Sequence, residues 1–156
     1  MADDSAGPVA GCYVCDKHRG LRHAMPGGPL WADELTVVTH IDPRDTAVDD
    51  VYLGHLLVEP RRHAPGLADL TADEARHVGQ WASHAARALR EEAGAEHVYA
   101  AVIGDGVPHL HLHLMPRYPG TPREYWWDRV NEWPDGPHGG VAEAAELVAR
   151  LRSVTP

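Results

Sequence analysis

Apolar residues along the chain follow two spacings, one typical of helices and one of strands. Thr71–Ala93 is predicted to be a long helix, whose apolar face carries Val78, Trp81, Ala85 and Leu89. Thr71-Ala-Asp-Glu74 forms a capping box at its start, and Gly94 supplies a stop signal at its end. A second, shorter helix is predicted at Val141–Leu151.

Segments rich in β-branched and apolar residues predict four strands: Glu34–Ile41, Val51–Glu59, His97–Gly104 and His109–Met115. The polar, turn-rich residues Asp42–Asp50 predict a loop, and Arg117–Gly140 predicts an ordered loop or short helix. Residues 1–10 are expected to be a flexible tail. Because the sequence contains neither an internal repeat nor a domain linker, we expect one α+β domain over residues 11–156.

Composition narrows the function classes. The chain has 156 residues with 14 Lys and Arg against 23 Asp and Glu, a net charge of −9. This charge argues against partners such as nucleic acid polymers and anionic membranes, because both surfaces repel an acidic protein. No apolar stretch approaches the ~20 residues that a bilayer span needs. The first residues resemble no signal peptide, so we expect a cytoplasmic protein.

Histidine is abundant, with 12 residues, and three of them alternate with leucine in His109-Leu-His-Leu-His-Leu-Met115. On a strand this alternation places His109, His111 and His113 on one face and the leucines on the other. Such a row suits three chemistries: a catalytic metal site, a phosphate site with imidazole donors, or an imidazole nucleophile that attacks phosphorus.

Both cysteines of the chain lie in Cys12-Tyr-Val-Cys15. In a chain expected in a reducing compartment, this spacing indicates a metal site or a redox pair rather than a structural disulfide. No βαβ pattern surrounds the pair, which disfavours a thioredoxin-like redox role.

Three segments together resemble the histidine triad (HIT) superfamily. His109–Met115 matches its His-φ-His-φ-His-φ-φ signature, where φ is apolar, and Gly54-His-Leu-Leu-Val-Glu-Pro-Arg-Arg-His63 is similar to a second family segment. Cys12-x-x-Cys15 lies where the zinc-binding branch carries its pair. The resemblance ends near Tyr118, which leaves 118–156 as a C-terminal extension. It implies a HIT-like antiparallel sheet of about five strands with one long and one short helix, usually in a homodimer.

The resemblance also implies a role for each histidine. His111 corresponds to the nucleophile that takes a nucleotidyl group from the α-phosphorus of a small-molecule nucleotide. His113 corresponds to a donor to a phosphate oxygen or the leaving group, and His55 to a fourth active-site histidine. The implied activity is a hydrolase or nucleotidyl transferase that forms a covalent histidine intermediate.

In zinc-bearing members the first triad histidine is a metal ligand, which implies a set of Cys12, Cys15, His63 and His109. Two thiolates and two imidazoles make a closed shell, the pattern of structural zinc. We expect this zinc to pin an N-terminal hairpin to the sheet. His55 competes with His63 as a ligand, but the two flank Pro60, so only one is expected to face the metal.

Two positions depart from the family pattern and concern the substrate. Where many members grip the ribose with Asp or Asn, this chain has His40, with Asp42 as the alternative. Gly106 stands where members carry Ser or Thr, and its backbone N–H is left to contact phosphate. Arg117 and Arg123 either neutralise phosphate or are solvated.

Other interpretations remain open at this point. The Trp-rich segment 125–133 is a lid, a dimer contact or plain packing. A metal-dependent hydrolase with its ion on the triad and a non-catalytic nucleotide sensor are the alternative functions. The remaining histidines are interpreted as loop or helix-surface residues: His18, His23, His77, His84, His97 and His138.

Overall fold

A five-stranded antiparallel sheet forms the centre of the structure, a computed structural model that describes residues 7–156. Residues 1–6 of the expected flexible tail lie outside the described residues. The strands lie in the order β1 (Trp31–Ala32), β2 (Thr36–His40), β4 (Leu56–Pro60), β6 (Leu112–Arg117) and β5 (His97–Val102). A separate pair joins β3 (Val51–Tyr52) to β7 (His138–Gly139). The predicted α+β class with a five-stranded antiparallel sheet is confirmed.

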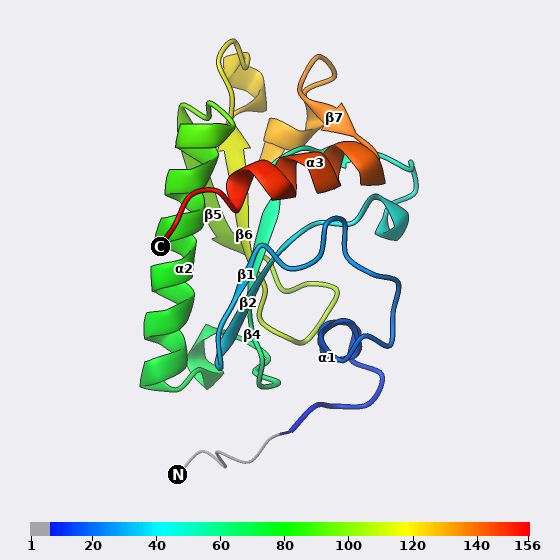
Figure 1. Cartoon of the computed structure of the whole chain (residues 1–156), viewed down its shortest axis with the longest axis vertical. Coiled ribbons are helices and arrows are strands. Elements are labelled where there is room, and N and C mark those ends of the chain that lie inside the picture. The colour runs from blue at the N-terminus through cyan, green and yellow to red at the C-terminus, as the bar shows by residue number, and fades with distance from the viewer. Residues whose placement is uncertain (1–6) are drawn as a thin grey trace.

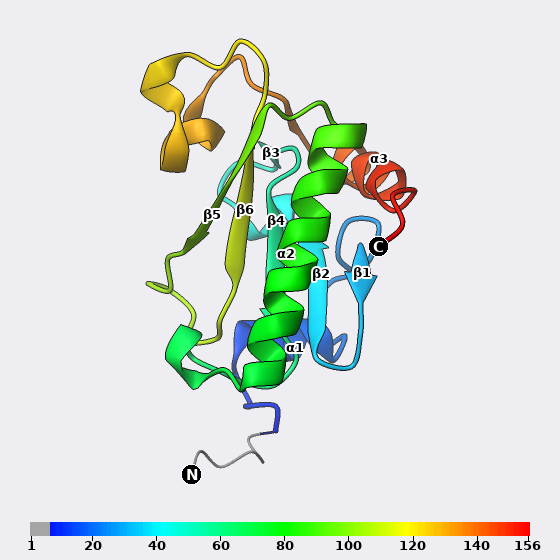
Figure 2. The same ribbon diagram turned by 90° about the vertical axis from the view of Figure 1, so that its left-hand side faces the viewer.

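The long helix α2 (Ala72–Glu92) covers one face of the sheet (Figures 1 and 2). It begins as predicted, because the hydroxyl of Thr71 accepts from the Glu74 amide while the Glu74 carboxylate accepts from the Thr71 amide. Its buried apolar side chains are Val78, Ala85, Ala88 and Leu89. They pack on the sheet residues that point to this side, which include Val38, Leu56, Val58 and Leu114.

The C-terminal helix α3 (Val141–Leu151) has the predicted bounds and packs against α2. Leu147, Val148 and Leu151 are buried in the same core as the sheet. Between β6 and α3 the chain forms two short 3₁₀ segments, Arg123–Tyr125 and Trp127–Glu132, before β7. The C-terminal segment therefore completes the core instead of hanging from it.

A short helix, α1 (Tyr13–His18), lies on the face of the sheet opposite α2 (Figures 1 and 2). The expectation of an N-terminal hairpin was wrong. Cys12 precedes the helix and Cys15 lies in its first turn, so three-residue spacing brings both thiols to the same side. A helix of six residues is too short to show a helical repeat in the sequence.

All four predicted strands have different bounds in the structure: Glu34–Ile41 shortens to β2 and His97–Gly104 to β5, and the other two change more. The segment predicted at 51–59 divides into β3 and β4 at Gly54, whose φ of +93° and contact with the Tyr118 hydroxyl both favour glycine. The histidine strand begins only at Leu112. Before it, the Leu110 amide donates to the Ala64 carbonyl, so the first two triad histidines precede the regular ladder. Among the described helices, none is long and apolar enough to cross a membrane.

Candidate active site and metal centre

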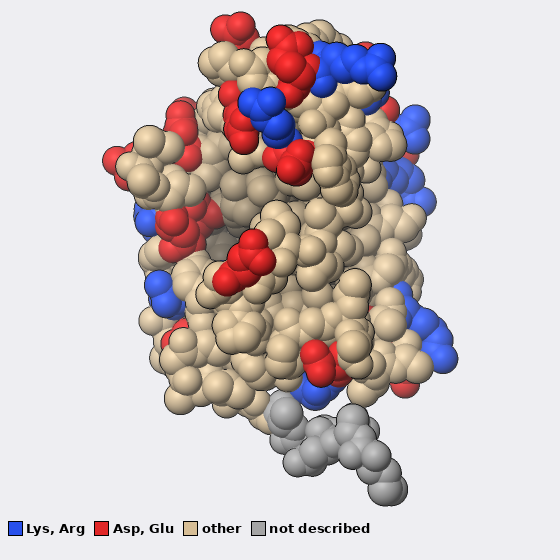
Figure 3. Space-filling model, turned by 180° about the vertical axis from the view of Figure 1, so that it is seen from behind, with Lys and Arg blue, Asp and Glu red and all other residues tan. Residues whose placement is uncertain are grey.

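A cavity of about 470 Å³ lies on the α1 side of the sheet. His111 and His113 form part of its wall, while Tyr13, Val14 and Lys17 of α1 form another part. The strand register explains this placement: His113 pairs with Leu57, and Leu57 and Glu59 share this face of β4 by strand alternation. Acidic side chains gather round the hollow on the back of the molecule (Figure 3), so attraction for a phosphate must come from local groups.

His111 has a fixed tautomer. Its Nδ1 lies 2.7 Å from the carbonyl oxygen of His109. Because a carbonyl only accepts, Nδ1 carries the proton and donates this bond. Nε2 therefore keeps its lone pair, and the ring lines the cavity. His111 is thus arranged as a nucleophile or a base.

His113 and His55 form a second imidazole pair, with His113 Nδ1 2.9 Å from His55 Nε2. Burial, then repulsion from His113, lowers the pKa of His55 to about 3. Burial, then repulsion from His111, lowers the pKa of His113 to about 4. Both rings are therefore neutral near pH 7, and one donates to the other.

The direction of that bond follows from the rest of His55. Its Nδ1 is buried and has no hydrogen-bond partner among the described residues. A buried lone pair costs less than a buried unbonded N–H, so the proton belongs on Nε2, which donates to His113. The Nε2 of His113 then carries a proton and is the ring atom left to donate into the cavity.

Beside the histidines lies a buried charge network that the sequence did not reveal. Lys17 Nζ donates to Glu59 Oε1 at 2.6 Å, and His18 Nε2 lies 2.9 Å from Glu59 Oε2. Burial alone raises the pKa of Glu59, but the charge of Lys17 and the bond from His18 outweigh it and lower the pKa to about 2. His18 was interpreted as a loop or surface residue; its side chain is in fact buried. Lys17 as the only lysine of the chain was the available signal.

Both ribose candidates line the cavity, but their polar atoms are bonded differently. His40 is buried, its Nδ1 donates to the Ile41 carbonyl at 2.7 Å, and its Nε2 accepts from the Gly54 amide at 2.9 Å. Both ring nitrogens are therefore used within the protein. Asp42 lines the cavity with His23 and is held by Arg44, whose Nε donates to Asp42 Oδ1 at 2.9 Å.

The other substrate candidates, Gly106, Arg117 and Arg123, do not line the cavity. Gly106 is exposed, and its neighbour Val107 lines the cavity instead. Arg117 lies four residues beyond His113 on β6, which is roughly 13 Å along a strand. Its guanidinium stacks on Trp126 at 4.0 Å and lies 3.7 Å from Glu96, so the structure does not bring it to the histidines. Arg123 lies over the same ring.

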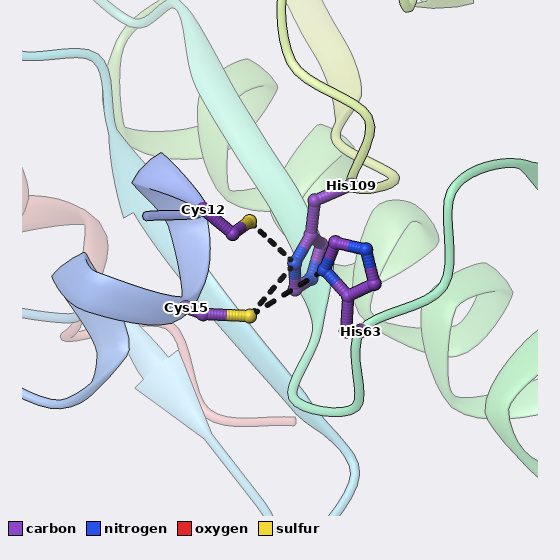
Figure 4. Close-up of side chains that lie close together, drawn as sticks. All are labelled: Cys12, Cys15, His63 and His109. Atoms are coloured by element: carbon purple, nitrogen blue, oxygen red, sulfur yellow. Dashed lines mark hydrogen bonds between the residues drawn. The ribbon is translucent and has the colours of Figure 1, made fainter. Parts of the chain in front are cut away.

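The four residues implied as zinc ligands come together at the edge of this site (Figure 4). Cys12 and Cys15 come from the α1 segment, His63 follows β4, and His109 precedes β6. Their ligand atoms all lie within 4.8 Å of one another. His109 Nδ1 is 3.5 Å from both sulfurs, and His63 Nδ1 is 3.6 Å from Cys15 Sγ. His55 is not in this group, because it pairs with His113.

This geometry fits a tetrahedral zinc ion. Zinc–sulfur bonds of about 2.3 Å and zinc–nitrogen bonds of about 2.0–2.1 Å give sulfur-to-nitrogen edges of roughly 3.5 Å. His109 Nε2 donates to the Pro60 carbonyl at 2.9 Å, which leaves Nδ1 free of a proton and directed at the thiols. Because both nitrogens of His109 are committed here, an ion held by all three triad histidines does not fit.

Comparison with known proteins finds relatives in one family. The model of the family described as HIT domain matches residues 32–120, more than half of the chain. A bifunctional bis(5'-adenosyl)-triphosphatase/adenylylsulfatase of Arabidopsis thaliana is 37% identical over 71 residues, which cover 42% of this chain and only 39% of that protein.

Solved structures show the same fold. A HIT family protein from Bacillus anthracis has a TM-score of 0.59 at 25% identity, over 71% of this chain and 76% of its own. A zinc-bound histidine triad family protein from Mycobacterium smegmatis has a TM-score of 0.67 at 22% identity, over 92% of this chain and 94% of its own. A hypothetical histidine triad nucleotide-binding protein from Sulfolobus tokodaii has a TM-score of 0.68 at 18% identity, over 92% of this chain and 91% of its own.

Proposed function

Since the chain belongs to the HIT domain family, whose members include nucleotide hydrolases, we propose that it cleaves a nucleotide at the α-phosphorus through a covalent intermediate on His111. The observation that carries this proposal is the bond from His111 Nδ1 to the His109 carbonyl, which leaves a lone pair on Nε2. His113 supports it, because a neutral imidazole beside the nucleophile offers a donor to phosphate oxygen.

The proposed reaction has two steps. The lone pair of His111 Nε2 attacks the α-phosphorus, and the bond from phosphorus to the leaving group breaks with its electron pair on that group. His113 Nε2–H donates to a non-bridging oxygen, and the His109 carbonyl holds the Nδ1 proton of the ring that becomes cationic. Water then attacks phosphorus, the phosphorus–nitrogen bond breaks with its electron pair on Nε2, and the attacking water loses one proton to the solvent. His111 is neutral again, and the product is a nucleoside monophosphate. A second phosphate in place of water would make the protein a transferase.

The substrate proposed is a small-molecule nucleotide with a phosphoanhydride or phosphoramidate bond. The Arabidopsis relative acts on such anhydrides, judged by its name. Of the substrate contacts proposed, Asp42 is favoured over His40, because both ring nitrogens of His40 are bonded within the protein. Gly106 stays a backbone candidate, whereas Arg117 is supported only if a partner chain brings it to a neighbouring site.

Zinc is proposed as a structural ion on Cys12, Cys15, His63 and His109, whose ligand atoms lie close together. That the histidine triad protein from Mycobacterium smegmatis is zinc-bound supports this proposal. Bound to these four residues, zinc cross-links three segments that are distant in the sequence. His109 then has two functions, since its ring is a ligand and its carbonyl orients His111. Cys12 and Cys15 are buried and form no disulfide, which favours a reducing compartment, the cytoplasm, as the location.

A homodimer is proposed from the edge of the sheet. Strand β5 pairs with β6 on one side only, so its other side has open backbone groups. Its side chains are half-buried or exposed, and Ile103 directly after it is 53% exposed. A second copy would satisfy this edge.

Intact-protein mass spectrometry during turnover tests the proposal. We expect wild-type protein to gain the mass of a nucleoside monophosphate and His111→Ala to show no adduct, with turnover reduced on the order of 10³-fold or more. His77→Gln is the matched control, because His77 lies on α2, on the opposite face of the sheet, and should keep both adduct and rate. Full turnover by His111→Ala would refute the covalent route, and ligand binding without any turnover would support a sensor.

A further inference from the structure

Lys17 occupies an unusual place for a lysine. It is the only lysine in the chain, it is 9% exposed, and it lines the same cavity as His111 and His113. Burying an ammonium costs free energy unless partners replace its water. Packing alone therefore does not explain a lysine here, and its charge and N–H donors must have a role.

The partners of Lys17 among the described residues leave one N–H group of its ammonium available. Its ammonium has three N–H groups, and among the described residues two oxygens face it: Glu59 Oε1 at 2.6 Å and, more weakly, Thr39 Oγ1 at 3.4 Å. Glu59 is completely buried, and its second oxygen is bonded by His18. The pair therefore presents a hydrogen-bond donor to the cavity and keeps its acceptors inside.

The surroundings of this donor suit a flat, largely apolar group. The apolar and aromatic residues that line the cavity with Lys17 include Tyr13, Val14, Met25, Ile41 and Leu57. The Lys17 ammonium lies 5.9 Å from the centre of the Tyr13 ring. Ligand pockets typically combine such walls with one or two polar groups that set orientation and specificity. With phosphate at the histidines, this wall is left for the base.

We propose that Lys17 reads the nucleobase of the substrate and selects a 6-oxopurine, guanine or hypoxanthine, over adenine. This inference rests on the proposed function, since it assumes a nucleotide in the cavity. A 6-oxopurine presents two adjacent acceptors, O6 and N7, and lysine bonds well to that edge. Adenine places an amino donor beside N7, so the ammonium would meet a second donor there. Glu59 lies at the same cavity but does not compensate, because its side chain is completely buried and its two oxygens are bonded to Lys17 and His18.

Calorimetric binding of GMP, IMP and AMP to the zinc-loaded protein tests the inference. We expect GMP and IMP to bind about 10-fold more tightly than AMP, or more, which corresponds to about 1.4 kcal/mol. IMP lacks the 2-amino group of GMP, so similar affinity for these two assigns the preference to the O6 and N7 edge. Equal or tighter binding of AMP would overturn the inference.

Two variants assign the preference to Lys17. Removing Lys17 alone would leave a buried, unpaired carboxylate, so the informative change is Lys17→Met with Glu59→Gln, which removes both charges and keeps a partner for His18. We expect its affinities for the three nucleotides to fall within about 3-fold of one another, whereas Lys17→Arg keeps the preference. Unchanged preference in the double variant would contradict the assignment. Equal weakening of all three nucleotides would mean that Lys17 attracts phosphate.

These outcomes separate the inference from the proposed function. A protein that prefers AMP and still forms the His111 adduct keeps the proposed function and refutes base reading by Lys17. A protein that binds none of the three nucleotides and forms no adduct refutes both. Circular dichroism and zinc content, expected to match the wild type, show that the double variant is folded.

Discussion

Two histidines of one motif, His109 and His111, serve opposite purposes although only Leu110 separates them. His109 is completely buried, with one ring nitrogen bonded to the Pro60 carbonyl and the other directed at two thiols. His111 is half-buried, with one nitrogen bonded to a carbonyl and the other left with its lone pair at a cavity. What distinguishes a structural ligand from a reactive group here is whether the second nitrogen already has a partner.

The two sites are also physically connected. The carbonyl that orients His111 belongs to His109, so anything that fixes the ring of His109 restrains the acceptor as well. Glu59 gives a second connection, because it bonds both His18 and the cavity residue Lys17. The ring of His18 in turn contacts that of His109, with 5.9 Å between their centres. The proposed zinc ligands therefore also hold in place the residues that line the cavity around His111.

The largest expected effect is a difference in stability between alanine variants of His109 and His111. His109→Ala removes a zinc ligand, so we expect the free energy of unfolding to fall by roughly 4 kcal/mol or more, with loss of zinc. His111→Ala removes a group with one internal bond, so we expect a loss within roughly 1 kcal/mol and full zinc content. Urea unfolding and metal analysis of both variants measure the contrast.

Removing zinc from the wild-type protein with a chelator tests whether the proposed ion is structural or catalytic. A strong zinc chelator should lower the melting temperature and abolish activity together, because the zinc supports the fold. Activity lost while the melting curve stays unchanged would instead identify a catalytic metal. Equal destabilisation by the two alanine variants would remove the distinction between the sites.

An intermediate effect concerns pH and the imidazole pair. The folded pKa of His113, about 4, lies below its unfolded value of about 6.5, so the unfolded chain binds the proton first as pH falls. The stability that this group contributes is present above about pH 6.5 and is lost between there and about pH 4. We expect wild-type stability to fall by roughly 1–3 kcal/mol more than that of His113→Gln over this window.

Urea unfolding of both proteins at several pH values measures this difference. The proposed zinc ligands are the same in both proteins, so their contribution cancels in the comparison. Parallel stability curves for the two proteins would show that His113 is not held neutral by its surroundings.

The features that the sequence could predict are those that depend on residues close together in the chain. The capping box at Thr71 and the apolar repeat of 71–93 are local, and α2 follows them. The six-residue helix α1 carries no repeat, so it was missed. The Lys17–Glu59 pair joins residues 42 positions apart across α1 and β4, a contact that no local pattern encodes.

The candidate site shows the same limit. The ligand set came from family resemblance, since His63 and His109 lie 48 and 94 positions from Cys15. The match to phosphate-binding chemistry suggested Arg117, but β6 carries it away from His113 along the strand. His40 was predicted to contact ribose, but its buried ring bonds two backbone groups. The sequence of a strand end does not reveal such contacts.

The smallest expected effect tests how His55 acts on a site that it does not touch. His55 is absent from the cavity wall and bonds His113, so it is a positioning residue that sets which nitrogen of His113 carries the proton. His55→Leu removes that donor, and we expect kcat to fall about 10-fold, equivalent to about 1.4 kcal/mol, with KM nearly unchanged. His55→Gln retains an amide N–H that reaches Nδ1 of His113, so it should recover most of kcat.

Steady-state kinetics, with stability measured in parallel, separates this positioning role from a packing role. Lost packing would lower stability without a difference in kcat between the two variants. If Gln and Leu reduce kcat equally, the bond from His55 does not determine the protonation of His113, and the donor into the cavity must be set by the substrate itself.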